Sequence, residues 1–162
     1  MRLHMRSETP LKLVGGTGSP YTQKMVALLR YRRIPYSIQW GQPEAACDAM
    51  GIEKPRPIFM PTFFFDGDDG IAAECDSTPI IRRLEAMYSG RSVLPEDPAL
   101  AFIDYLIEDF ADEWCTKYMF HYRWHFNDDA DNAGTLLPLG MDVSMPTCLL
   151  YTSPSPRDRT TS

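Results

Sequence analysis

A glycine-rich turn between an apolar run and a helical pattern constrains this chain more than any other stretch. The apolar run covers residues 11–14, and three glycines follow it within 15–18. Ser19 and Pro20 then open the helical pattern, because serine suits an N-cap and proline suits the first helical position. Residues 11–33 therefore predict a strand, a loop and a helix whose N-terminus favours an anion.

The next stretch predicts a second strand over residues 36–40, where apolar and polar side chains alternate. A strand–helix–strand unit of this length implies parallel pairing through a right-handed crossover. A short helix is expected within 43–47. Pro61 lies inside an apolar run over 58–65, and it is placed at the start of the third strand because proline cannot donate to a ladder.

A hairpin and a third helix follow. Residues 66–70 read Asp-Gly-Asp-Asp-Gly, and they predict a turn into a return strand over 71–73. A helix is expected to begin within 76–79, and Gly90 is expected to close it in the left-handed conformation. The residues expected on its buried stripe are Ile80, Ile81, Leu84 and Met87.

A long helix is predicted after a short linker. Asp97 and Pro98 repeat the pattern of a cap followed by proline, and helical spacing continues to about Trp124. Regular pattern is lost after Asn127. If the helical domain is truncated, part of its core is missing, so we expect exposed apolar surface on the helix from Leu100 to Trp124 and marginal solubility or aggregation.

The chain is thus divided into three parts. Residues 9–90 form the first domain, and residues 97–145 form the start of an all-helical domain that is truncated here. Residues 146–162 are rich in Ser, Thr, Pro and Arg, and we interpret them as a disordered, non-native tail. They resemble translated sequencing-adapter sequence.

Composition narrows the function classes. A formal net charge of −6 argues against a general binder of nucleic acid or anionic membranes. No apolar signal segment and no membrane span are found, so a cytoplasmic location is expected. The cysteines are widely separated and form no C-x-x-C pair, which predicts reduced thiols. His121 and His125 precede Asp129 at helical spacing, but their aromatic neighbours favour packing over a metal site.

Three short motifs, in order, give the chain a family resemblance: Ser19-Pro20-Tyr21, Met60-Pro61-Thr62 and Asp76-Ser77. Together with the long helix, they resemble the glutathione transferase superfamily, in a poorly characterised branch. The resemblance implies an α/β thioredoxin-like domain with a mixed four-stranded sheet, in the order β-α-β-α-β-β-α. An incomplete all-α domain follows it.

The resemblance also implies a glutathione site. Ser19 takes the catalytic position, and Met60 with Pro61 matches the cis-proline segment whose backbone pairs with the cysteinyl part of glutathione. Asp76 and Ser77 match the pair that holds the γ-glutamyl end. A hydroxyl at a helix N-terminus favours the glutathione thiolate without itself becoming charged.

Further polar side chains are candidates for the same site. Tyr21 carries a second hydroxyl, but its position in the helix turns it toward another face. Lys24 or Arg82 is a candidate to assist at the carboxylates of the peptide. The sequence alone does not place either cation.

The function implied is transfer of glutathione, as co-substrate and without a metal, to a small apolar electrophile. The alternative is a non-catalytic glutathione-transferase-like module for protein interaction. Whether the protein forms a homodimer is left open. A glutaredoxin-like thiol–disulfide oxidoreductase is a weaker alternative, because residues 19 and 22 are Ser and Thr rather than Cys. The activity is assigned to a full-length parent, and the truncation leaves it open for this chain. Ser19 and Asp76 also suit simple helix caps, and Pro61 also suits an edge strand.

Overall fold

The computed structural model describes residues 9–68 and 70–139. The chain divides into two compact units after Glu96, and each unit is described by itself. The tail assigned to residues 146–162 lies outside the described residues. Within the described part of the chain, no helix has both the length and the apolar character needed to cross a membrane.

A mixed four-stranded sheet organises the first unit. Its strands are β1 (Leu11–Gly15), β2 (Tyr36–Trp40), β3 (Thr62–Gly67) and β4 (Gly70–Glu74). The strand order is β2-β1-β3-β4, with β1 parallel to β2 and antiparallel to β3, and with β3 antiparallel to β4. The predicted sheet, its parallel crossover and its hairpin are therefore confirmed.

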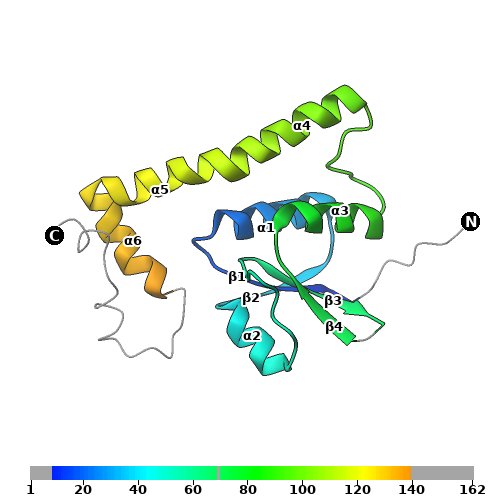
Figure 1. The fold of residues 1–162 in the computed structure, drawn as a ribbon, viewed down its shortest axis with the longest axis horizontal. Coiled ribbons are helices and arrows are strands. Elements are labelled where there is room, and N and C mark those ends of the chain that lie inside the picture. The colour runs from blue at the N-terminus through cyan, green and yellow to red at the C-terminus, as the bar shows by residue number, and fades with distance from the viewer. Residues whose placement is uncertain (1–8, 69, 140–162) are drawn as a thin grey trace, which may run out of the picture. The chain divides into compact units, whose positions relative to one another are not determined.

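Helices cover both faces of this sheet (Figure 1). Helices α1 (Pro20–Arg32) and α3 (Ser77–Met87) lie on one face, and α2 (Pro43–Met50) lies on the other. Side chains alternate along a strand, so Phe63 and Phe65 pack with α1 and α3, whereas Phe64 packs with α2. The aromatic run after Pro61 is buried on both faces for this reason.

The end of α3 differs from the prediction. Met87 is the last helical residue and is 41% exposed, so its place on the buried stripe was wrong. Tyr88 leaves the helix in an extended conformation, and Tyr88 and Val93 pack against the core there. Gly90 does have a positive φ of 82°, but it lies beyond the cap and does not close the helix.

The second unit is helical. It contains α4 (Pro98–Phe110), a π-helical turn η1 (Ala111–Cys115), α5 (Thr116–His125) and α6 (Asn127–Leu139). Asp97 caps α4 as predicted, and its carboxylate accepts from the backbone N–H groups of Ala99 and Leu100.

Two features of this unit escaped the sequence prediction. The predicted long helix contains the π turn, and α6 forms where the regular pattern was expected to end. Asp128 and Asp129 lie in the first turn of α6, where the helix dipole favours negative charge. Because these residues are polar, the start of α6 lacks the apolar spacing from which a helix is predicted.

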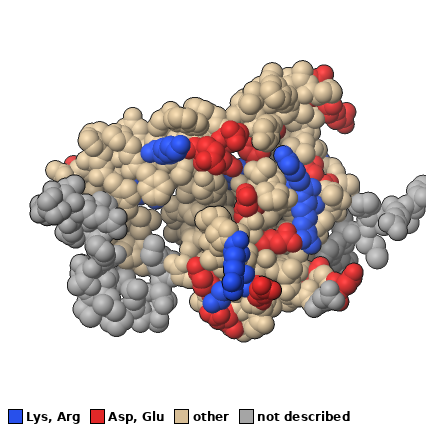
Figure 2. All heavy atoms as spheres, in the orientation of Figure 1, with Lys and Arg blue, Asp and Glu red and all other residues tan. Residues whose placement is uncertain are grey.

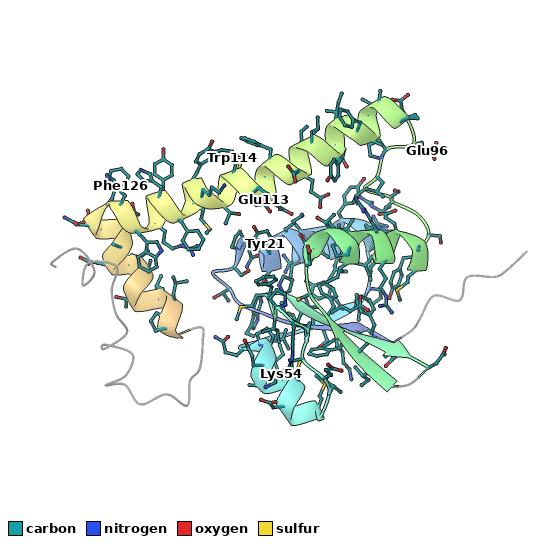
Figure 3. All side chains as sticks on the ribbon, in the orientation of Figure 1. Tyr21, Lys54, Glu96, Glu113, Trp114 and Phe126 are labelled. Atoms are coloured by element: carbon teal, nitrogen blue, oxygen red, sulfur yellow. The ribbon has the colours of Figure 1, made fainter. Side chains whose placement is uncertain are left out.

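The predicted apolar surface of the long helix is confirmed. No residue of α4, η1 or α5 is buried, and Ile107, Phe110 and Trp114 are each at least half exposed. Figure 3 labels Trp114 and Phe126, the latter in the bend between α5 and α6. Apolar area on this scale, open to water, favours association between molecules.

We therefore expect the purified chain to self-associate as its concentration rises. Replacing Ile107 and Phe110 by glutamine should reduce the fraction of associated species severalfold, because the change removes apolar area from the exposed face. Sedimentation velocity over a series of concentrations measures this fraction. Asp109→Asn, which lies between the two sites, is the control, and equal association in all three proteins would contradict the prediction.

Charged side chains of both signs are mixed on the face shown in Figure 2. The ion pairs of the first unit include Lys54 with Asp48, at 2.7 Å, and Arg83 with Glu74. The Arg83 guanidinium also lies 3.9 Å from the centre of the Phe65 ring. Lys54 and Arg83 are therefore both engaged in local ion pairs.

Candidate functional site

Strand pairing brings three separate segments to one edge of the sheet. Val14 at the end of β1 pairs with Thr62 at the start of β3, and Phe63 pairs with Glu74 at the end of β4. The turn into α1, the Pro61 segment and the start of α3 therefore meet at this edge. These three segments carry the three motifs singled out in the sequence.

Ser19 is the N-cap of α1. Its backbone is extended, with φ −86° and ψ 118°, and its Oγ accepts a hydrogen bond from the Thr22 backbone N–H at 3.2 Å. The same hydroxyl donates to the Met60 carbonyl oxygen at 3.5 Å. That distance is at the long limit for a hydrogen bond, so a stronger acceptor placed nearby would take the proton instead. Ser19 thus caps the helix and contacts the Met60 segment at once.

The loop before Ser19 depends on residues that the sequence prediction did not assign to the site. Thr22 is fully buried, and its hydroxyl accepts from the Gly16 backbone N–H at 3.3 Å. A Cβ atom on Gly16 would lie 2.9 Å from the Met60 sulfur, and one on Gly15 would lie 2.6 Å from the Thr22 side chain. Glycine at both positions lets the loop approach its neighbours. In the sequence, the run of glycines was the signal that could have indicated this close packing of the loop.

The Met60 segment has its own local order. The Met60–Pro61 peptide bond is cis, as is Arg56–Pro57. The Thr62 hydroxyl donates to the Phe59 carbonyl oxygen at 2.7 Å, which holds the turn into β3. Pro61 is buried and Met60 is half-buried, and the Met60 carbonyl oxygen lies beside the Ser19 hydroxyl.

Asp76 and Ser77 begin α3. Asp76 is the N-cap, and its Oδ1 accepts from the Thr78 backbone N–H at 3.3 Å, while the residue stays exposed. Its φ is +81° with ψ 119°, a conformation that L side chains rarely adopt. Such a residue costs on the order of 1–3 kcal/mol, and strain of this kind clusters at functional sites. Ser77, directly after it, is 4% exposed.

Of the two candidate cations, the structure places one beside these residues. The Lys24 ammonium donates to the Ser77 hydroxyl oxygen at 3.0 Å, which links α1 to the start of α3. Arg82 is exposed on α3. Tyr21 is half-buried on the first turn of α1 (Figure 3). Two contacts therefore involve α1 or its N-cap. Ser19 contacts Met60, and Lys24 contacts Ser77.

Other reactive side chains lie elsewhere in the described residues. Cys47 lies on the buried side of α2, and this burial raises the pKa of its thiol, which favours the protonated form. His121 and His125 stack with ring centres 4.5 Å apart beside Tyr122 and Phe126. Within residues 9–68 and 70–139, no group of three or more metal-ligating side chains occurs.

Comparison with known proteins bears on the first unit. Residues 13–92 match the family model described as the glutathione S-transferase N-terminal domain. The matched residues include the whole of α1, β3, β4 and α3, and they therefore contain each motif described above. No curated protein matches the chain.

Proposed function

Residues 13–92 are a thioredoxin-like glutathione S-transferase N-terminal domain, and from this premise we propose that the chain binds glutathione at the sheet edge. The bound thiol is held as its thiolate for attack on a small apolar electrophile. The observation that carries the proposal is the contact between the Ser19 hydroxyl and the Met60 carbonyl, at the edge where Asp76 and Ser77 also lie.

The thiolate is the species that reacts. An unperturbed thiol has a pKa of about 8.5, so most of it is protonated at neutral pH. Redirecting the Ser19 proton from Met60 to the ligand sulfur, beside the N-terminus of α1, stabilises the thiolate. A lowering of the thiol pKa by about two units corresponds to about 2.7 kcal/mol. The sulfur then forms a bond to carbon, and the leaving group departs with the electron pair of the broken bond.

The two ends of the ligand match different groups of the site. The exposed Asp76 carboxylate suits the ammonium of the γ-glutamyl residue, while the Ser77 hydroxyl and backbone suit its carboxylate. The Met60 backbone suits the cysteinyl amide in the middle. Binding of this peptide would also supply a reason for the costly backbone conformation of Asp76.

The function is tested by calorimetric titration of the chain with glutathione, combined with pH titration of the bound thiol. We expect binding, with a thiol pKa below that of free glutathione. If glutathione binds but its thiol pKa is unshifted, the catalytic role is excluded and the non-catalytic interaction module is favoured. If glutathione does not bind, the proposal is overturned. Glutathione-dependent reduction of a disulfide would favour the glutaredoxin-like alternative.

Asp76→Asn is expected to weaken glutathione binding about tenfold or more, since it removes the charge that pairs with the ammonium. Asparagine can still cap α3, and it tolerates positive φ better than most residues, so the fold should persist. Calorimetry measures the affinity, and the thiol pKa should remain nearly unchanged.

Asp66→Asn is the matched control for this experiment. Asp66 is an exposed residue near the opposite end of β3, and its replacement makes the same change in charge. Equal weakening by both variants would mean that net charge, rather than contact with Asp76, governs binding.

A further inference from the structure

The chain leaves α3 through a short segment that is held at both of its ends. Residues 88–93, the strap, follow α3 directly (Figure 1). Arg32 Nη2 donates to the Tyr88 carbonyl oxygen at 2.6 Å, which holds the first end. The Val93 backbone N–H donates to Glu85 Oε1 at 3.1 Å, which holds the second end. Tyr88 and Val93 also pack against the core.

The two side chains that hold the strap are the partners of one ion pair. Arg32 comes from α1 and Glu85 from α3, and Arg32 Nη1 lies 3.0 Å from Glu85 Oε1. The same pair therefore joins the two helices and holds the backbone of the strap. Because loss of this pair would weaken both ends together, the strap is expected to open as one local unit.

The middle of the strap is exposed and has an unfavourable backbone conformation. Residues 89–92 are exposed, and none of them lies in a helix or a strand. Gly90 and Arg91 have φ of 82° and 45°, and positive φ is costly for arginine. The Arg91 guanidinium contacts the exposed Tyr31 ring, at 4.5 Å from its centre. A backbone of this kind persists only where the surrounding structure enforces it, and the two held ends provide that restraint.

The closed strap also leaves polar groups of Arg32 without good partners. The Arg32 side chain is 1% exposed, but its Nε and Nη1 form no well-directed hydrogen bond within the described residues. Water that reaches Arg32 when the strap opens would satisfy these groups. This hydration offsets part of the attraction lost with Glu85, so opening requires less free energy than it would for a fully satisfied buried pair.

We propose that the Arg32–Glu85 pair is a latch for the strap. While the pair is intact, the strap is closed, and the connection between the packed first unit and α4 is limited to residues 94–96. When the pair breaks, residues 88–93 detach while the sheet, α1 and α3 stay folded, and the connection lengthens to residues 88–96. The latch thus sets the length of the tether that joins the second unit to the first, and this role is separate from glutathione binding.

A pair that only adds to stability predicts a different result. Its loss would expose every part of the first unit alike, whereas loss of a latch opens the strap selectively. The double variant Arg32→Met with Glu85→Leu separates the two cases, because apolar packing can replace a buried pair without loss of stability. The new side chains supply no donor for the Tyr88 carbonyl and no acceptor for the Val93 N–H.

The experiment compares the full-length wild type with this double variant by limited digestion with trypsin and by hydrogen exchange. We expect cleavage after Arg91, and exchange of the strap amides, to be about tenfold faster or more in the double variant. Cleavage after Arg82, within α3, and exchange in β1 and β3 should change far less. Asp48→Ala breaks the exposed pair with Lys54 and should leave the strap unchanged.

Two results would overturn the latch. Wild-type rates at the strap in the double variant would mean that the packing of Tyr88 and Val93 is enough to hold it. Equal acceleration in the strap and in the sheet would mean that the strap opens only when the whole unit unfolds. Thermal unfolding confirms that each variant is folded. If the double variant does not fold, Glu85→Gln replaces it, and the rate at the strap is again compared with the rate in the sheet.

Discussion

Replacing Ser19 by alanine is expected to raise the pKa of the bound glutathione thiol by about two units. The hydroxyl that now contacts the Met60 carbonyl at 3.5 Å would no longer be available to the ligand sulfur. At a pH near 6.5 the thiolate fraction, and with it the rate of attack, should fall by a factor of about fifty. Ultraviolet absorbance of the thiolate, followed against pH, measures the shift directly.

The same substitution also removes the cap of α1. Loss of an N-cap costs about 1 kcal/mol of stability, which must be separated from the effect on the thiol. Ser19→Thr keeps a hydroxyl and a cap, and should leave the thiol pKa low. Asp97→Ala removes the cap of α4 instead, and should affect stability without affecting the thiol. A thiol pKa unchanged in Ser19→Ala would leave Ser19 with the capping role alone.

A second large effect is expected at the buried ion pair between α1 and α3. Glu85→Ala should lower the free energy of unfolding by about 3–5 kcal/mol, because it leaves a buried guanidinium without its counter-charge. The Arg32 side chain is 1% exposed, and its Nη1 lies 3.0 Å from Glu85 Oε1. The Glu85 carboxylate also accepts from the Val93 backbone N–H at 3.1 Å. A loss of this size is a large fraction of the stability of an ordinary domain.

Apart from Glu85, few described groups compensate the positive charge of Arg32. Its Nη2 donates to the Tyr88 carbonyl oxygen, but Nε and Nη1 form no well-directed hydrogen bond within the described residues. The pair with Glu85 is therefore held mainly by Coulomb attraction at low exposure. Chemical denaturation monitored by circular dichroism measures the loss.

The exposed pair of Lys54 and Asp48 provides the matched control. Asp48→Ala should cost at most about 1 kcal/mol, because both partners are solvated. The double variant Arg32→Met with Glu85→Leu should recover most of the stability lost in Glu85→Ala. A cost for Glu85→Ala no greater than that for Asp48→Ala would show that water reaches Arg32 and contradict the prediction.

Local rules were sufficient to predict the strands and the helix starts of the first unit, although not the end of α3. Residues 63–65 were assigned to a strand because aromatic residues follow Pro61, and the structure buries them on both faces of the sheet. Ser19 was recognised as a cap from its place before Pro20. These features depend on residues close in sequence, for which capping preferences and alternation give direct information.

Contacts between residues that are distant in the sequence could not be predicted from it. The link from Lys24 to Ser77 and the pair of Arg32 with Glu85 depend on how α1 and α3 pack on one face of the sheet. No local pattern encodes which cation of a helix meets which partner. The exposed end of α3 at Met87 was missed for a related reason, since Tyr88 and Val93 occupy the core there.

The π turn within the long helix has a consequence for insertions and deletions. A π turn holds more residues than an α-helical turn, so η1 accommodates one extra residue in an otherwise continuous helix. Deleting one residue within 111–115 would restore α-helical geometry and leave the faces of α4 and α5 nearly in phase. Deleting one residue within α4 itself would instead rotate the residues before the deletion by roughly 100° relative to α5. The π turn is thus the place where this helix can lose one residue without changing which side chains share one face.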